Sequence, residues 1–247
     1  MDSRLSLNIL PQPDEITCGP TCLQAVYAYF GDHLSLDQVI DEVPMLEGGG
    51  TLGVWLACHA LRRGYRATIY TFKLQLFDPT WLASGGPDPV ERLKAQMAVK
   101  NDPKLHTASK AYLEFFRLGG KLLLQDLTPA LIRRFLKRNR PIITGLSATY
   151  LYQSPREFGP KCEYDDIKGE PSGHFVVLCG YDRENRKVMI ADPLHTNPIA
   201  NGHKYSSPIS RVINAILLGV LTYDGNLIIL EPRHSRKRNY AKSYRRR

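Results

Sequence analysis

The chain has 247 residues with 43% hydrophobic and 23% charged content, and its formal net charge is +9. This size and composition predict a protein that folds and buries a sizeable core, as one large domain or as two packed lobes. The longest apolar run near the C-terminus, AILLGVL, is far shorter than the roughly 18 to 20 residues that a bilayer span needs, so no transmembrane helix is expected.

The positive charge is concentrated at the C-terminus. Residues 231–247 contain eight lysines and arginines and one acidic residue, which leaves 25 basic and 23 acidic residues in 1–230. We therefore expect a nearly neutral folded domain over residues 1–230 and a basic, disordered tail over residues 231–247. The tail could bind weakly to an anionic partner such as RNA or anionic lipid, or could serve solubility alone.

The five cysteines are odd in number and scattered along the chain, at positions 18, 22, 58, 162 and 179. The first residues, MDSRLSLNILPQP, lack the basic start, apolar stretch and small-residue cleavage site of a secretory signal. Both features predict a cytoplasmic protein with reduced thiols.

The first half of the chain shows mainly helical patterns. Apolar residues recur at helical spacing from Pro20 until Gly31, and Ser35 and Thr51 precede two further helical patterns. Gly64 stands where a left-handed helix end is expected, and the alternating, β-branched segment after it is typical of a strand. The expected helices cover residues 20–30, 36–43, 52–63, a segment that begins at 88–89, and 104–118, with a strand at 65–72.

The second half is rich in short apolar runs. Thr128 and Pro129 form a helix start, and the loop 150–173 lies directly ahead of His174. Loops of that length in a compact domain are more often functional than idle. The expected strands cover residues 121–127, 141–147, 174–181, 187–193 and 226–232, and the expected helices cover 130–138 and 208–218. The pattern predicts an α+β fold with a helical lobe over about residues 1–118 and a β-rich lobe over about residues 119–230.

Cys18 is the candidate nucleophile. It stands just before the helix that Pro20 begins, where unpaired backbone N–H groups and the positive end of the helix dipole favour a thiolate. Gly19 allows a close backbone turn and is expected to leave room for a substrate carbonyl. The alternative is that Cys18 is a small buried hydrophobic residue.

Three further residues complete the candidate site. His174 enters a predicted strand, is the best placed of the seven histidines, and is the candidate general base. Asp192, at the end of the next strand, could accept the other ring N–H of His174 and fix its tautomer. Gln12 could swing its amide to the place where a tetrahedral oxyanion would form beside the Cys18 backbone N–H. Each of them alone has an ordinary structural explanation.

Together these residues stand in the order Gln, Cys, His, Asp that papain-like enzymes use. The motifs QPDEITCGPTC, GHFVVL and IADP resemble the stand-alone relatives of the bacteriocin leader peptidases, family thirty-nine of the cysteine peptidases, over residues 12 to about 195. The resemblance implies a papain-like fold with Cys18 as nucleophile, His174 as general base, Asp192 as orienting residue and Gln12 in the oxyanion hole. It implies a peptide or protein substrate, no cofactor and no metal, and a functional link to an ATP-grasp peptide ligase.

Three other interpretations stay open at this stage. Cys18 and Cys22 could supply two metal ligands one helical turn apart, although no second close Cys/His pair follows, and Cys22 is more simply a buried neighbour. The same Cys-His-Asp set could pass its acyl group to an amine or thiol, as acyltransferases and transpeptidases do. The chain could also be an inactive papain-like binding module whose basic tail contacts nucleic acid.

Overall fold

The structure is a computed structural model that describes residues 3–159, 161–222 and 225–233. Helices dominate the N-terminal half of the chain, as the sequence predicts. The helices are α1 (Cys18–Phe30), α2 (Leu36–Glu42), α3 (Gly53–Arg62), α4 (Pro89–Val99), α5 (Pro103–Arg117), α6 (Pro129–Leu136), α7 (Ala148–Tyr152) and α8 (Ile209–Leu218), with 3-10 turns η1 (Pro79–Trp81) and η2 (Gly219–Thr222).

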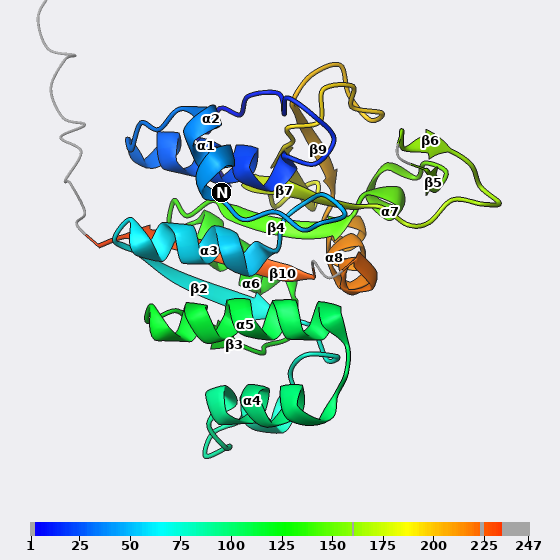
Figure 1. Ribbon diagram of the computed structural model, residues 1–247. Helices are drawn as coiled ribbons and strands as arrows, with labels where there is room; N and C mark the ends of the chain where they lie inside the picture. The colour runs from blue at the N-terminus through cyan, green and yellow to red at the C-terminus, as the bar shows by residue number, and fades with distance from the viewer. Residues whose placement is uncertain (1–2, 160, 223–224, 234–247) are drawn as a thin grey trace, which may run out of the picture.

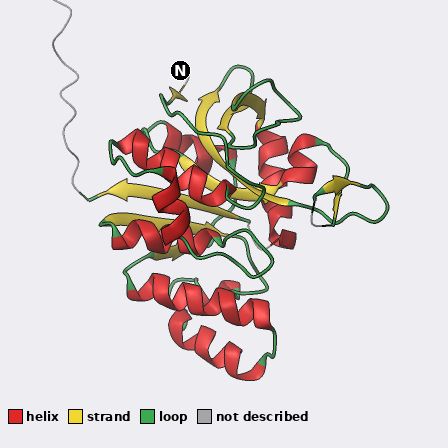
Figure 2. Ribbon diagram, turned by 45° about the horizontal axis from the view of Figure 1, so that its top comes forward, coloured by secondary structure: helices red, strands yellow, loops and turns green. Residues whose placement is uncertain are grey.

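Eight of the strands form one sheet (Figures 1 and 2). Their order is β3-β2-β10-β4-β7-β8-β9, and β1 also pairs with β7. The pair β2 and β3 is parallel, while β10 runs antiparallel to both of its neighbours. The strands are β1 (Ser3–Arg4), β2 (Tyr65–Thr71), β3 (Lys121–Leu123), β4 (Ile142–Ser147), β7 (Gly173–Asp182), β8 (Lys187–Ala191), β9 (Lys204–Pro208) and β10 (Asn226–Pro232); β5 (Glu157–Phe158) and β6 (Glu163–Tyr164) form a separate ribbon.

The predicted α+β class is confirmed. The three apolar runs of the second half, at β4, β7 and β8, are neighbours in the sheet, as expected. The sheet also takes in β2, from the half predicted to be helical, because β2 pairs with β10 over seven residues, Tyr65–Thr71. The first half of the chain thus supplies both helices and part of the sheet.

Local capping explains most helix boundaries. The hydroxyl of Ser35 accepts from Gln38 N at 3.1 Å and begins α2, and the hydroxyl of Thr128 accepts from Leu131 N at 3.2 Å and begins α6. Thr51, which precedes the third helical pattern, does not cap α3, and Leu52 stands at the N-cap position. The Thr51 hydroxyl donates to the carbonyl of the preceding loop, at Pro44, over 2.7 Å.

The helices pack on one another as well as on the sheet. In Figure 1, α1, α3 and α5 follow one another down the molecule, and α4 lies outermost. Helix α1 packs against β7, which brings its first turn beside the start of that strand. Phe175 of β7 is buried there, and a Cβ on Gly19 of α1 or on Gly53 of α3 would lie within 3.5 Å of its ring. The first turn of α1 is therefore fixed against the start of β7.

The predicted boundary at residue 231 falls inside a strand. Glu231 and Pro232 belong to β10, and the Glu231 carboxylate pairs with Arg140 at 3.0 Å. Residues 234–247 of the predicted basic tail lie outside the described residues. The lobe boundaries and the tail remain predictions.

Candidate active site

Cys18 lies in the first turn of α1. The helix begins at Cys18, two residues earlier than the sequence pattern suggested, and Thr17 at the N-cap makes no side-chain capping bond. The first amides of a helix have no acceptor within the helix, so the sulfur stands beside donors and the positive end of the dipole. The side chain is almost buried, with 8% of the residue exposed.

The space beside Gly19 is already filled, contrary to the expectation that it is kept for a substrate carbonyl. A Cβ at Gly19 would lie 2.5 Å from Thr51 Cγ2 and 3.3 Å from the ring of Phe175. The hydroxyl of Thr51 is tied to Pro44 O, so its methyl group cannot easily move. Gly19 is thus required by close packing between α1 and the segment before α3.

His174 lies at the start of β7, opposite Leu146 of β4. It is 6% exposed, its side chain is hydrogen-bonded to Asp192, and it lies close enough to Cys18 for the two side chains to interact. Nε2 donates to Asp192 Oδ1 over 2.9 Å. Since Asp192 uses Nε2, the other ring nitrogen, Nδ1, is left for Cys18. The structure therefore brings together the three residues that the sequence singled out on separate elements.

Opposite charges decide the protonation of His174 and Asp192. Burial lowers the pKa of His174, but the charges of Asp192 and Cys18 outweigh it and raise this pKa to about 10. Burial raises the pKa of Asp192, but the charge of His174 and its hydrogen bond outweigh it and lower this pKa to about 2. Near neutral pH the pair is an imidazolium beside a carboxylate.

Asp192 follows the end of β8 and collects further donors. Its Oδ1 accepts from Leu194 N at 3.0 Å. Its Oδ2 accepts from Tyr152 OH at 2.8 Å, Tyr205 OH at 2.7 Å and Asn197 Nδ2 at 2.9 Å. Nothing in the sequence marks these three side chains, because a single tyrosine among thirteen, or a single asparagine in a loop, carries no signal of its own.

Gln12 lies beside the Asp192 segment. Its backbone N–H donates to Pro193 O at 2.8 Å, and only 6% of the residue is exposed. Its Nε2 donates to Asp14 O at 2.8 Å, which fixes the orientation of the amide, and its buried Oε1 has no hydrogen-bond partner among the described residues. An NH₂ group carries two donors, so the second N–H of Nε2 is free of the Asp14 contact.

The other four cysteines are poorly suited to act as nucleophiles. Burial raises the pKa of Cys22 well above its usual range, and its Sγ donates to Phe175 O at 3.3 Å. Burial also raises the pKa of Cys58 to about 12 and of Cys179 to about 11, and it raises the pKa of Cys162. Cys22 is therefore the buried neighbour of Cys18 that the sequence suggested.

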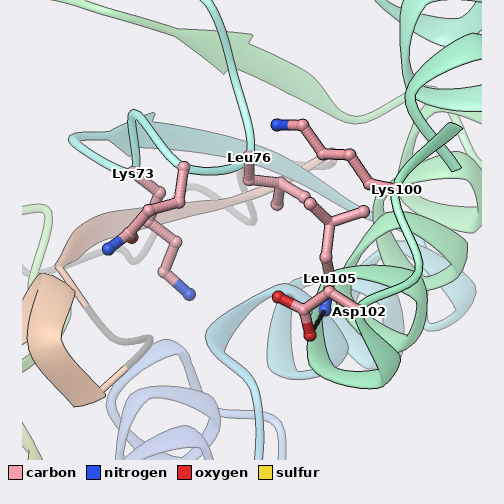
Figure 3. Close-up of a pocket in the computed structure, with 6 residues that line it drawn as sticks. Lys73, Leu76, Lys100, Asp102 and Leu105 are labelled. Atoms are coloured by element: carbon pink, nitrogen blue, oxygen red, sulfur yellow. Dashed lines mark hydrogen bonds between the residues drawn. The ribbon is translucent and has the colours of Figure 1, made fainter.

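A cavity of about 400 Å³ lies in another part of the molecule (Figure 3). It is formed between the segment after β2 and the turn before α5, where Asp102 caps α5 by accepting from Lys104 N and Leu105 N. None of the four predicted site residues is among those that line it: Lys73, Gln75, Leu76, Lys100, Asp102 and Leu105.

A model of the Peptidase_C39 like family matches residues 88–212, about half of the chain. The chain belongs to the Peptidase_C39 like family. This confirms the resemblance drawn from the sequence motifs and the papain-like fold class, and it makes the chain a cysteine peptidase of that family. The match includes His174 and Asp192, whereas Gln12 and Cys18 precede it, and the roles of all four residues remain predictions.

Similar solved structures are also peptidases. A C39-like peptidase from Bacillus anthracis is 15% identical, with 94% of this chain and 98% of that chain covered and a TM-score of 0.47. A double glycine motif protease from an AMS/PCAT transporter, solved in complex with its leader peptide, is 15% identical, with 93% and 94% covered and a TM-score of 0.44. Xylellain, a cysteine protease from Xylella fastidiosa, is 12% identical, with 94% and 86% covered and a TM-score of 0.45. No curated protein sequence matches this C39-like peptidase significantly.

No helix in the described part of the chain is both long and apolar enough to cross a membrane.

Proposed function

We propose that this C39-like peptidase hydrolyses a peptide or amide bond through a thioester formed on Cys18. The observation that best supports the proposal is that one buried imidazole, His174, is hydrogen-bonded to Asp192 and interacts with Cys18. A thiol beside an imidazolium is the arrangement that activates a cysteine at neutral pH.

The proposed reaction has two halves. The Cys18 sulfur attacks the carbonyl carbon, and the C–N bond breaks as His174 gives its proton to the leaving amine. A water molecule then attacks the thioester while His174 takes one of its protons, and the carboxylic acid leaves as the sulfur is released. Asp192 accepts from the imidazolium throughout and keeps its charge.

The oxyanion that develops on the substrate carbonyl needs hydrogen-bond donors close to the Cys18 sulfur. We propose the backbone N–H of Cys18 and the second N–H of Gln12 Nε2 as these donors, because the first lies at the start of α1 and the second is not used by Asp14. We also propose a reducing compartment such as the cytoplasm, because the nucleophile and the four other cysteines are free thiols.

A random peptide library tests the proposal. Wild-type protein incubated with the library is expected to generate new peptide termini and, after acid quenching, an acyl adduct on Cys18 in intact-mass spectra. The Cys18→Ala variant is expected to give neither. Cleavage that persists in Cys18→Ala would overturn the proposal. Products that are amides of an added amine, with no free acids, would assign acyl transfer in place of hydrolysis.

A further inference from the structure

Asp192 is enclosed by an unusually large number of donors. It is fully buried, and five hydrogen bonds reach its carboxylate, from His174, Leu194, Tyr152, Tyr205 and Asn197. An ionised carboxylate offers about four lone-pair positions. The carboxylate therefore has no free acceptor position. Its pairing with His174 accounts for only one of the five hydrogen bonds.

The two oxygens of the Asp192 carboxylate accept hydrogen bonds from different groups. Oδ1 receives His174 Nε2, while Oδ2 receives the two tyrosine hydroxyls and the Asn197 amide. The torsion that rotates a carboxylate is soft and roughly two-fold, so an unrestrained aspartate could turn away from the imidazole. Such a rotation here would break three hydrogen bonds at Oδ2 together.

The backbone of Asp192 is also held by hydrogen bonds. Asp192 N donates to His203 O at 2.9 Å, and His203 Nδ1 lies 3.0 Å from Asp192 O. Tyr152 also packs against the imidazole that Asp192 binds, with ring centroids 6.2 Å apart and an angle of 53° between the planes of Tyr152 and His174. One tyrosine thus contacts both members of the ion pair.

We propose that Tyr152 and Tyr205 are positioning residues that fix Asp192 Oδ1 on His174 Nε2 and so keep His174 directed at Cys18. This inference rests on the proposed function, since it assumes that the Cys18 and His174 contact activates the thiol. Both tyrosine hydroxyls donate to Asp192 Oδ2, so the proposed role is exerted through Asp192.

The charges around the pair agree with this role. Burial raises the pKa of Asp192, but the charge of His174 and the hydrogen bonds, including that of Tyr205, lower it to about 2, so Asp192 stays ionised as the counter-charge of the imidazolium. The titratable groups that face Asp192 and His174 are Cys18 and Cys22 on α1, Tyr152 on α7, Tyr205 on β9 and His203 before β9.

The rate at which iodoacetamide alkylates Cys18, followed by intact mass and peptide mapping from about pH 5 to about pH 10, tests this inference without a known substrate. At about pH 6.5, Tyr152→Phe and Tyr205→Phe are each expected to react about tenfold more slowly than wild type, because fewer molecules hold the thiolate and imidazolium together. At about pH 10 the rates are expected to converge, since alkaline solvent ionises thiols without an imidazolium.

Tyr27→Phe is the matched control. Tyr27 is fully buried, and its hydroxyl also bonds a titratable side chain, His59, at 2.8 Å, but on the far part of α1. It is expected to lose thermal stability as the other variants do and to keep the wild-type alkylation rate. Wild-type rates at about pH 6.5 in folded Tyr152→Phe and Tyr205→Phe would overturn the inference.

Two further variants are needed, one in case a tyrosine variant does not fold and one to test the proposed function separately. Asn197 is only partly buried, so Asn197→Ala can be studied if a tyrosine variant does not fold, and it is expected to slow alkylation in the same direction. His174→Ala tests the proposed function separately. If its alkylation rate equals that of wild type, the activation of Cys18 by His174 is wrong; if it is slow while the tyrosine variants are fast, only the positioning role is wrong.

Discussion

The candidate site comprises Gln12, Cys18, His174 and Asp192, and two tyrosine hydroxyls donate to the carboxylate of Asp192. Cys18 precedes a helical pattern and His174 and Asp192 flank adjacent strands, so local sequence signals mark them. Tyr152 and Tyr205 meet at Asp192 only because α7 and β9 fold around the end of β8. No spacing along the chain records that meeting, since it depends on tertiary structure.

Gln12→Ala should reduce peptide turnover while leaving the protein folded. Removing one oxyanion donor typically costs about 100- to 1,000-fold in turnover. Steady-state rates with a cleaved library peptide measure the effect, and Gln38→Ala, which changes an exposed glutamine on α2, serves as the control. Turnover within about threefold of wild type would remove Gln12 from the oxyanion hole.

Gly19→Ala should destabilise the fold by about 1 to 3 kcal/mol, the usual cost of overpacking. The added methyl group would meet the pinned side chain of Thr51 at 2.5 Å. Urea unfolding measures the change. Gly48→Ala is the matched control, because a Cβ there meets nothing within 4 Å, and equal losses in the two variants would contradict the packing argument.

Helices α2 and α6 were predicted from the sequence, whereas strand β9 and the short helix α7 were not. Ser35 and Thr128 mark α2 and α6 because their side chains accept helix amides in the structure as the sequence suggested. The strand β9, with the sequence KYSSP, has no apolar run, and α7 falls partly within a segment predicted to be a loop. In the fold, β9 pairs with β8 and α7 packs against α8.

Asp102→Ala should lower the stability of the protein by about 1 kcal/mol without changing Cys18 reactivity. Asp102 caps α5 through two backbone amides, and loss of an N-cap typically costs about that much. The unfolding midpoint and the alkylation rate measure the two properties. The exposed Asp126 provides the control substitution, and an Asp102→Ala midpoint no lower than that of Asp126→Ala would contradict the capping role.

The order of the sheet could not have been predicted from the sequence. The last strand of the chain, β10, inserts between β2 and β4 and joins the two halves into one sheet. Apolar patterns identify strands but do not say which strands pair across long separations. The predicted separation into a helical and a β-rich lobe describes the distribution of elements along the chain, while the sheet runs through both halves.

The ion pair at the site should make the stability of the whole molecule depend on pH. A raised pKa in the folded state, about 10 for His174 against about 6.5 in an unfolded chain, gives stability that is complete below about pH 6.5 and lost as the pH rises to about 10. The lowered pKa of Asp192, about 2 against about 3.9 in an unfolded chain, gives stability that is present above about pH 4 and lost as the pH falls to about 2.

Urea unfolding of wild type and His174→Gln at about pH 6.5, 8 and 10 measures this contribution. The stability advantage of wild type should be largest at about pH 6.5 and should shrink towards pH 10, because the charged imidazole is then lost. An advantage that stays constant across this range would show that His174 is not held as an imidazolium.

The site of modification by one equivalent of iodoacetamide at about pH 7 tests the central claim most directly. Peptide mapping should find the label on Cys18, because His174 interacts with this thiol, while burial raises the pKa of Cys22, Cys58, Cys162 and Cys179. Label found first on Cys162 or Cys58, with Cys18 unmodified, would contradict the account.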